Sequence, residues 1–565
     1  MPMTRRELLQ ATAVVSLASL GTGAGCEPDC GPLTTVADGP LTIDTHAHVF
    51  NATDLQVRDF IGRVGGRQVD GGLSRVATYF GEVLQGFAWN VAPTAQQELN
   101  LLNGLPRFWN RGGCWIVDSL RQQQELMYRL GVEQLKARAR EMNAVRSSAR
   151  GSWESASSTE KGLWAIEDLP NEMAPQDMQP LTAEVRSVDE PERASVRSAL
   201  EFLVSMFQPR YVSALELMQV FGSEERRMDL IVPSLVDYDF WLSKGSGARS
   251  SLGEQMAVME KIAQVTVGRV HPFVPFCPFR EAQYQADGST FSSLAYVKSC
   301  VEEQGAIGVK LYPPMGFAAL GNADKDIWRQ TSDLPPLAAG PEFGRKLDQA
   351  LQSLYAYCSQ NDVPIMAHTN QSNGPSVEFE QLAGPAYWKR ALEEYPTLRI
   401  SFGHFGTLTP RGDVAASAVA FLELMSIDSG AMGERAYADS SYFAEVLGEA
   451  ELLENALVEL FQRDTQTKRV LSQRLMFGSD WKMLRLENEA DTYLRRFDEL
   501  TQRVARRLDP GGDASGLRER LFGANAADFL GLRRGEKNRE RLEAFYARSG
   551  LRMSEIPWVS KVDRL

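Results

Sequence analysis

Four of the chain's five histidines, and one late aspartate, stand at the ends of short apolar runs. These candidates are His46, His48, His368, His404 and Asp480. The runs that carry them occupy 43–48, 364–368, 401–404 and 476–481. An apolar run of this length is typical of a buried strand, and imidazole and carboxylate groups are metal ligands. The sequence therefore predicts that separate strands present one cluster of metal-binding side chains.

The chemistry of this cluster follows from the spacing of its members. His46 and His48 are two residues apart on a predicted strand, so both side chains face the same way and can bind one ion. His368 and Asp480 can complete the coordination. Ligands without thiolate suit Zn²⁺, and also Fe²⁺ or Mn²⁺. An open position makes such a site catalytic, because the ion lowers the pKa of a bound water to about 7.

Two of the candidates are expected to move protons. Asp480 could both touch the metal and accept the proton of the attacking water. His404 would hydrogen-bond the water or the oxyanion that develops on the substrate. We therefore expect Asp480 and His404 to be catalytic, and His46, His48, His368 and Asp480 to be metal ligands.

The elements that must position these groups form a regular series. Short apolar runs alternate with helical stretches from residue 229 onward, and the predicted strands are 41–48, 229–236, 269–276, 306–312, 363–368, 398–403, 435–440 and 474–479. Such alternation predicts parallel βαβ units, and eight units are the number in a (β/α)₈ TIM barrel. The candidate residues would all lie at the carboxyl ends of strands, where catalytic groups of such barrels are found. The fifth histidine, His271, also falls on a predicted strand but outside the set.

The predicted barrel is interrupted early in its 565 residues. Residues 41–50 and 229–532 would form the barrel, 51–228 a mainly helical insertion after the first strand, and 533–565 a C-terminal extension. The serine-rich centre of the insertion, 147–159, is expected to be a surface loop. The insertion either forms a lid over the pocket or serves as a surface or dimerisation element.

The motifs, in their order, resemble those of the amidohydrolase superfamily, and most closely its amidohydrolase-related branch, which also contains decarboxylases. The resemblance rests on Asp44-Thr45-His46-Ala47-His48, Ala367-His368, Gly403-His404 and Gly478-Ser479-Asp480-Trp481, followed by Leu521-Phe522-Gly523-Ala524-Asn525-Ala526-Ala527 as the segment that caps the barrel. It covers 41–50 and about 229–532, and it implies the ligand set given above with His404 as catalytic acid/base. The long segment 50–228 departs from the family.

Three further residues are expected near the rim of the site. Lys310 ends the fourth predicted strand, where some superfamily members use a carbamylated lysine to bridge two metals; it could instead meet an anionic group of the substrate or be solvated. The related branch resembles the single-metal type, so one ion is favoured over two. Arg280 and Asp439 are weaker candidates for substrate binding, since charges at barrel ends are often only solvated.

The N-terminus resembles an export signal. Arg5-Arg6 precedes Leu8-Leu9, an apolar stretch and then small residues up to Cys26, as in a twin-arginine signal over residues 1–26. The alternative is a basic, fraying tail. Gly23-Ala24-Gly25-Cys26 also fits a lipoprotein cleavage site with a lipid anchor on Cys26, although glycine stands where leucine is usual. The protein is therefore expected to be periplasmic, or anchored to a membrane by a lipid.

Composition excludes some partners. A net charge of −13 argues against nucleic acid, and outside the N-terminus no apolar run is long enough to span a bilayer. The six cysteines have no close metal-type spacing, and Cys277, Cys300 and Cys358 are expected to be small buried hydrophobes. The partner is thus a small molecule, and the oligomeric state is left open.

Together these features predict a metal-dependent hydrolase that cleaves an amide, ester or lactone with activated water. A metal-dependent decarboxylase of an aromatic or related carboxylic acid is the alternative on the same scaffold. A metal-binding protein without catalysis is the third hypothesis.

Overall fold

The structure, a computed structural model, describes about two thirds of the chain. It covers residues 39–63, most of 85–104, scattered positions between 129 and 167, 206–221, and 226–565 except for short gaps at 330, 332–333, 371, 373, 407–415, 427–429, 464–469, 486, 488 and 511–514. Several predictions fall outside the described residues: the export signal over 1–26, the lipid anchor at Cys26, the serine-rich loop 147–159 and most of the proposed lid.

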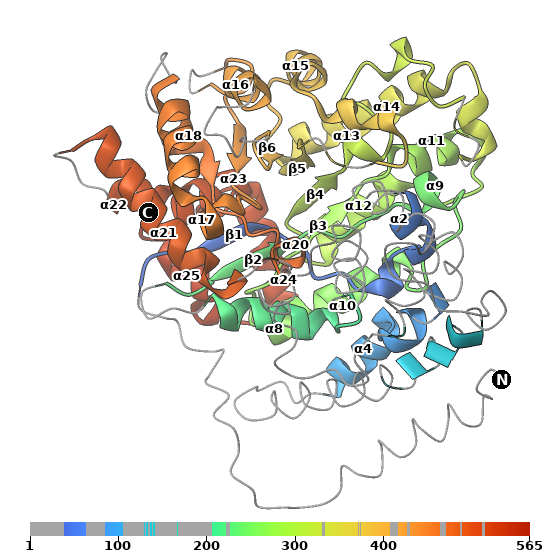
Figure 1. Ribbon diagram of the computed structural model, residues 1–565, viewed down its shortest axis with the longest axis horizontal. Helices are drawn as coiled ribbons and strands as arrows, with labels where there is room; N and C mark the ends of the chain where they lie inside the picture. Colours follow the sequence, from blue (N-terminus) through green and yellow to red (C-terminus); the bar gives the residue numbers. More distant parts are fainter. Residues whose placement is uncertain are drawn as a thin grey trace, which may run out of the picture.

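In the part of the chain that the structure describes, eight parallel strands form the centre of the molecule (Figure 1). They are β1 (Ile43–Ala47), β2 (Leu230–Pro233), β3 (Phe273–Pro275), β4 (Gly308–Leu311), β5 (Ile365–His368), β6 (Ile400–Gly403), β7 (Ala436–Asp439) and β8 (Leu475–Met476). β1 pairs with β2, and β3 to β8 pair in sequence order. Each strand lies within one of the eight predicted ranges, and the predicted α/β class is confirmed.

Hydrogen bonds between the two groups of strands close the sheet. Isolated bridges pair Ile231 with Val270 and Ser234 with Phe273, and these join β2 to the β3 region. On the other side, the Thr45 N–H donates to the Phe477 carbonyl oxygen at 3.1 Å, which joins β1 to the chain after β8. The strands therefore form a closed barrel, and the carboxyl ends of all eight lie at one rim.

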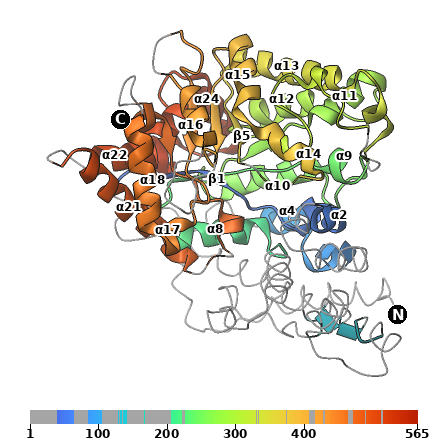
Figure 2. The same cartoon turned by 45° about the horizontal axis from the view of Figure 1, so that its top comes forward.

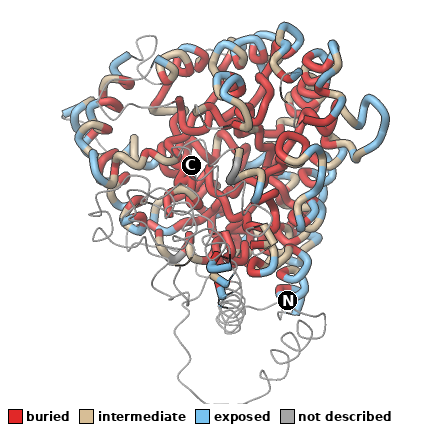
Figure 3. Tube along the Cα trace, turned by 45° about the vertical axis from the view of Figure 1, so that its right-hand side comes forward, coloured by how far each residue is buried: buried red, intermediate tan, exposed pale blue. Residues whose placement is uncertain are grey.

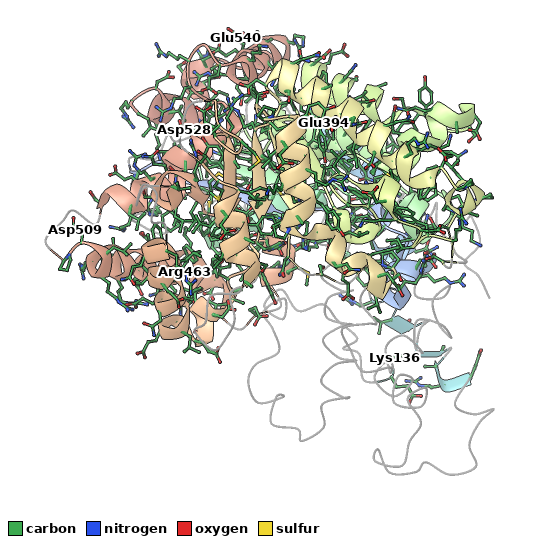
Figure 4. All side chains as sticks on the ribbon, turned by 90° about the horizontal axis from the view of Figure 1, so that it is seen from above. Lys136, Glu394, Arg463, Asp509, Asp528 and Glu540 are labelled. Atoms are coloured by element: carbon green, nitrogen blue, oxygen red, sulfur yellow. The ribbon has the colours of Figure 1, made fainter. Side chains whose placement is uncertain are left out.

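Helices with one apolar face cover the outside of the barrel. The longer ones are α10 (Leu252–Val265), α11 (Pro278–Asp287), α12 (Ser293–Glu303), α13 (Phe343–Asn361), α15 (Pro385–Glu394), α18 (Ala450–Arg463) and α21 (Tyr493–Leu508). Figure 3 shows the buried residues gathered in the interior with the exposed ones on the outer faces. Cys277, Cys300 and Cys358 are free and buried, which confirms the prediction that they pack as small hydrophobes. In Figure 4 the charged side chains of Glu540 and Asp509 lie at the outer edge of the molecule.

The described part of the insertion packs against the barrel helices. It contains α2 (Val57–Arg63), α4 (Ala95–Asn103) and α8 (Arg210–Val220), and Figure 2 shows α2 and α4 beside α9 (Asp239–Leu242) and α10. The fully buried guanidinium of Arg210 links these pieces. Its Nε donates to Asp54 at 2.9 Å and its Nη1 donates to Glu98 at 3.0 Å. One cation therefore fastens the loop after β1 to both α4 and α8.

The amino end of the barrel is closed by the last part of the chain. A π-helical turn (Arg520–Ala524) leads into α23 (Asn525–Leu530), where the Asn525 amide donates to the Leu475 carbonyl at 2.7 Å. A side chain at Gly523 would come within 2.6 Å of the Leu41 carbonyl, so only glycine fits there. The C-terminal extension folds back as α24 (Lys537–Ser549) and α25 (Pro557–Val562), and Lys561 forms a buried ion pair with Asp229 at 2.8 Å.

His271, the histidine outside the predicted cluster, lies in this closed end. Its Nδ1 donates to the Gly305 carbonyl and its Nε2 accepts from the Tyr546 hydroxyl, each at 2.7 Å. Burial lowers the pKa of His271 to about 4, whereas an unfolded histidine titrates near 6.5. The unfolded chain thus takes up this proton first as the pH falls, and the wild type loses stability between pH 6.5 and 4.

We expect His271→Gln to remove this pH dependence. From pH 7 to pH 4 the free energy of unfolding of the wild type should fall by about 3 kcal/mol relative to that of the variant. Urea denaturation of both metal-free proteins at the two pH values measures it. A difference that stays constant with pH would contradict the assignment.

Among the described helices, none combines the length and the apolar character needed to cross a lipid bilayer.

Candidate metal centre

Three of the predicted ligands meet at the carboxyl rim of the barrel. One ligand atom from each of His46, His48 and Asp480 lies within 4.8 Å of the others, and all three residues are buried. His46 is the last residue but one of β1 and His48 follows the strand, while Asp480 follows β8, so the hydrogen bonds that close the barrel also bring these ligands together. The Asp480 N–H donates to the His46 carbonyl at 2.7 Å.

Asp480 takes up an unusual backbone conformation at this point. Its φ is 52°, in the left-handed region that non-glycine residues rarely adopt. The bond to His46 and the start of α20 (Trp481–Leu484) hold it there. His404 has a φ of 64°. Strained conformations at two candidate residues are typical of functional sites whose surroundings fix the geometry.

His368 and His404 form a second pair beside this group. Their rings are 4.5 Å apart between centroids, and His368 Nδ1 lies 3.1 Å from His404 Nε2. His404 Nδ1 lies 3.0 Å from the Ser441 carbonyl, so it must carry a proton to donate there. His404 Nε2 is then an acceptor, and His368 donates to it through Nδ1. This leaves the lone pair of His368 Nε2 free.

Two buried ligand atoms have no hydrogen-bond partner among the described residues. They are His368 Nε2 and Asp480 Oδ1. A buried polar atom without a partner costs about 1–3 kcal/mol, so such atoms need an explanation. An imidazole nitrogen and a carboxylate oxygen at one rim fit a divalent cation, and the donor set His46, His48, His368 and Asp480 suits it.

Buried carbonyl and carboxylate groups orient the imidazoles. His48 Nδ1 donates to the Ser234 carbonyl at 3.1 Å, which turns Nε2 toward Asp480 Oδ1, 3.5 Å away. His46 Nδ1 lies 3.3 Å from both oxygens of Asp439, and His46 Nε2 accepts from Lys310 Nζ at 3.2 Å. Partners of this kind fix the tautomer and the direction of a metal-binding histidine.

Burial keeps the imidazoles of His48, His368 and His404 neutral near pH 7. Burial lowers the pKa of His48 to about 3, and burial together with His46 lowers the pKa of His404 to about 4. Burial also sets the pKa of His368 well below its usual value. Burial by itself would raise the pKa of Asp480, but positive charge at neighbouring groups, Lys310 among them, holds that pKa below its usual value, so the carboxylate is ionised. His48, His368 and His404 therefore present neutral imidazoles and Asp480 an anionic carboxylate, the state that binds a metal.

The weaker candidates lie in different surroundings. Lys310 is 2% exposed beside His46, and burial lowers its pKa to about 8. Asp439 is fully buried below His46, where it also accepts from the His404 N–H at 3.0 Å. Arg280 donates to Asp237 from Nε at 2.7 Å and from Nη2 at 2.9 Å. The predicted substrate contacts of these three side chains stay predictions.

Sequence reasoning missed two side chains of the site. The Ser441 hydroxyl donates to Asp439 at 2.5 Å and lies 2.8 Å from His46 Nδ1, so it connects these two groups. Its position two residues after Asp439 was a signal, because alternate residues at a strand end share a face. Tyr312 stacks on His368 with ring centroids 4.4 Å apart. It lies two residues after Lys310, so the same argument could have found it.

Comparison with known proteins identifies the family to which the chain belongs. The family model described as amidohydrolase matches residues 248–532, half of the chain. The chain belongs to the amidohydrolase family. Its predicted resemblance is thereby confirmed, and family members are metal-dependent enzymes.

Solved structures are similar in fold only. One is an uncharacterised TIM-barrel protein from Bordetella bronchiseptica, 16% identical, with a TM-score of 0.33 over 59% of this chain and 82% of that one. Another is a putative 2-pyrone-4,6-dicarboxylic acid hydrolase from Pseudomonas putida, 16% identical, with a TM-score of 0.32 over 56% of this chain and 86% of that one. No curated protein matches the chain.

Proposed function

We propose that this protein is a hydrolase that holds one divalent metal, most simply Zn²⁺, and cleaves an amide, ester or lactone of a small molecule. The observation that carries the proposal is the convergence of His46, His48 and Asp480, together with buried ligand atoms on His368 and Asp480 that have no hydrogen bond to any described residue. These four residues would hold the ion. A cation bound there would acidify a water molecule and polarise the carbonyl of the substrate.

The side chains around the metal site have separate roles in the proposed reaction. Asp480 is ionised, so it can accept a proton from the attacking water. His404 is neutral at pH 7, its Nδ1 donates to the Ser441 carbonyl and its Nε2 accepts from His368, so it can take up or return a proton at Nε2 only when His368 turns away from it. Asp439 and Ser441 hold His46 in place from below. The surrounding barrel residues are buried, which strengthens each of these interactions.

The buried ammonium group of Lys310 favours a substrate that carries negative charge. Lys310 Nζ lies beside the ligand His46 and lines the adjoining cavity. A carboxylate on the substrate would pair with it in a site that excludes water. A hydrolase of an organic acid and a decarboxylase would both bind a substrate carboxylate in this way, so the decarboxylase is the second candidate.

Metal analysis and a product assay test the proposal. Protein purified with Zn²⁺ should contain about one ion per chain, and about two would assign Lys310 as a carbamylated bridge between metals. The loaded protein is then offered amides, esters and lactones of carboxylic acids in H₂¹⁸O. Incorporation of ¹⁸O into the product supports the hydrolase. Release of carbon dioxide without ¹⁸O would replace it by the decarboxylase, and bound zinc with no turnover of either kind would indicate a metal-binding protein without catalysis.

A further inference from the structure

A cavity adjoins the candidate metal centre on the side of β2 to β4. Its wall is mostly apolar: Leu235, Val236, Trp241, Pro275, Phe276, Met315 and Phe317. The polar residues in the wall are Asp237, Tyr238, Cys277, Lys310 and Tyr312. The space that it encloses in this structure is about 10 Å³, room for about one water molecule, so it fits a single polar atom of a substrate held at the metal centre.

Most of these polar groups are already engaged within the protein. Both carboxylate oxygens of Asp237 accept from Arg280. The Tyr312 hydroxyl and the Ser372 hydroxyl lie 3.0 Å apart and form a hydrogen bond. Burial raises the pKa of the Cys277 thiol, so it stays uncharged. These three side chains shape the cavity, but their polar atoms are not free to bind a substrate.

Tyr238 differs from them. Among the described residues no group hydrogen-bonds to its hydroxyl, although the side chain is only 8% exposed. Its ring stacks on Phe60 of α2 with centroids 6.2 Å apart, and it meets Tyr312 edge-on at 5.5 Å. Tyr312 in turn stacks on His368. The Tyr238 ring is therefore fixed one aromatic ring away from the metal centre, and its phenol lies in the field of Asp480.

The backbone on both sides of Tyr238 is fixed by one cation. Arg280 binds Asp237 on one side, and its Nη2 donates to Asp239 at 2.9 Å on the other. The guanidinium lies between the rings of Phe240 and Phe291, 5.0 and 4.5 Å from their centroids. All these contacts are in or near the wall of the cavity. Arg280 thus restrains the residues before and after Tyr238 without occupying the pocket.

We propose that the Tyr238 hydroxyl donates a hydrogen bond to a carbonyl or carboxylate oxygen that a substrate held at the metal centre places in this cavity. Arg280 is a positioning residue that acts through Tyr238. This inference rests on the proposed function, and it names both the substrate class and a further binding residue. A buried donor aimed at an oxygen that gains charge stabilises the transition state more than the ground state.

Binding of benzohydroxamate to the zinc-loaded protein tests the proposal without turnover. This probe chelates zinc through two oxygens and offers its carbonyl oxygen to the Tyr238 hydroxyl. Tyr238→Phe keeps the ring contacts and removes the hydroxyl, so calorimetry should show affinity reduced about tenfold, the effect of one hydrogen bond. Tyr284→Phe is the matched control, because Tyr284 is exposed on α11 and does not line the cavity, and its affinity should stay within about twofold of wild type.

A double-mutant cycle tests the role of Arg280. If Arg280 acts through Tyr238, Arg280→Gln weakens benzohydroxamate binding in the wild type but has little further effect in Tyr238→Phe. Equal losses in both backgrounds would indicate a merely structural role. Tyr238→Phe binding as tightly as wild type would overturn the assignment of Tyr238, as would zinc-loaded wild type that does not bind the probe. Failure of the wild type to bind zinc would instead overturn the proposed function.

Discussion

Asp480→Asn is expected to lower kcat by about 10³-fold or more, because one residue supplies both an anionic metal ligand and the proton acceptor. The fold should survive the change. Asparagine has almost the same shape, and it tolerates the left-handed conformation at φ 52° better than most residues do. The loss should therefore come from chemistry and metal affinity, not from unfolding.

Turnover, metal content and thermal unfolding of this variant should be measured together. Asp509→Asn, at the exposed end of α21, is the matched control and should behave as wild type in all three. An Asp480→Asn protein that retains a tenth of the activity or more would exclude Asp480 as the proton acceptor.

Arg210→Ala is expected to destabilise the protein by about 3–5 kcal/mol. The substitution leaves the carboxylates of Asp54 and Glu98 buried with no countercharge from Arg210, and an uncompensated buried charge is strongly destabilising. Burial raises the pKa of Glu98 even though the positive charge of Arg210 acts to lower it. Removal of the cation should also release the loop after β1 from α4 and α8.

Chemical denaturation of the two proteins measures this loss. Arg495→Ala removes an exposed ion pair with Glu499 on α21 and should change stability by no more than about 0.5 kcal/mol. If Arg210→Ala costs as little as this control, the buried network does not fasten the insertion.

The fold could be predicted because the apolar runs were separated by helical stretches of regular length. Each observed strand falls inside a predicted run, since a strand buried on both faces is almost continuously apolar. The ligand cluster followed from the same pattern, because the carboxyl ends of parallel strands meet at one rim. His46, His48 and Asp480 were found in this way, and they do converge.

The contacts that orient the candidate metal ligands and join distant segments could not be predicted in the same way. The carbonyl of Ser234 orients His48, but a backbone oxygen leaves no mark in the residue types. Asp439 was expected at the rim, whereas its carboxylate is buried beneath His46, because the apolar run shows where a strand ends and not which way the last side chain points. The bonds of Arg210 join segments more than a hundred residues apart, which no local pattern reports.

The ion pair between Lys561 and Asp229 has a consequence for the order of folding. It joins the residue before β2 to α25, 332 residues later in the sequence. Closing so long a loop costs more chain entropy than pairing strands that are neighbours in the sequence, so this contact is expected to form late. The strands of the barrel therefore pair before its lower opening is sealed.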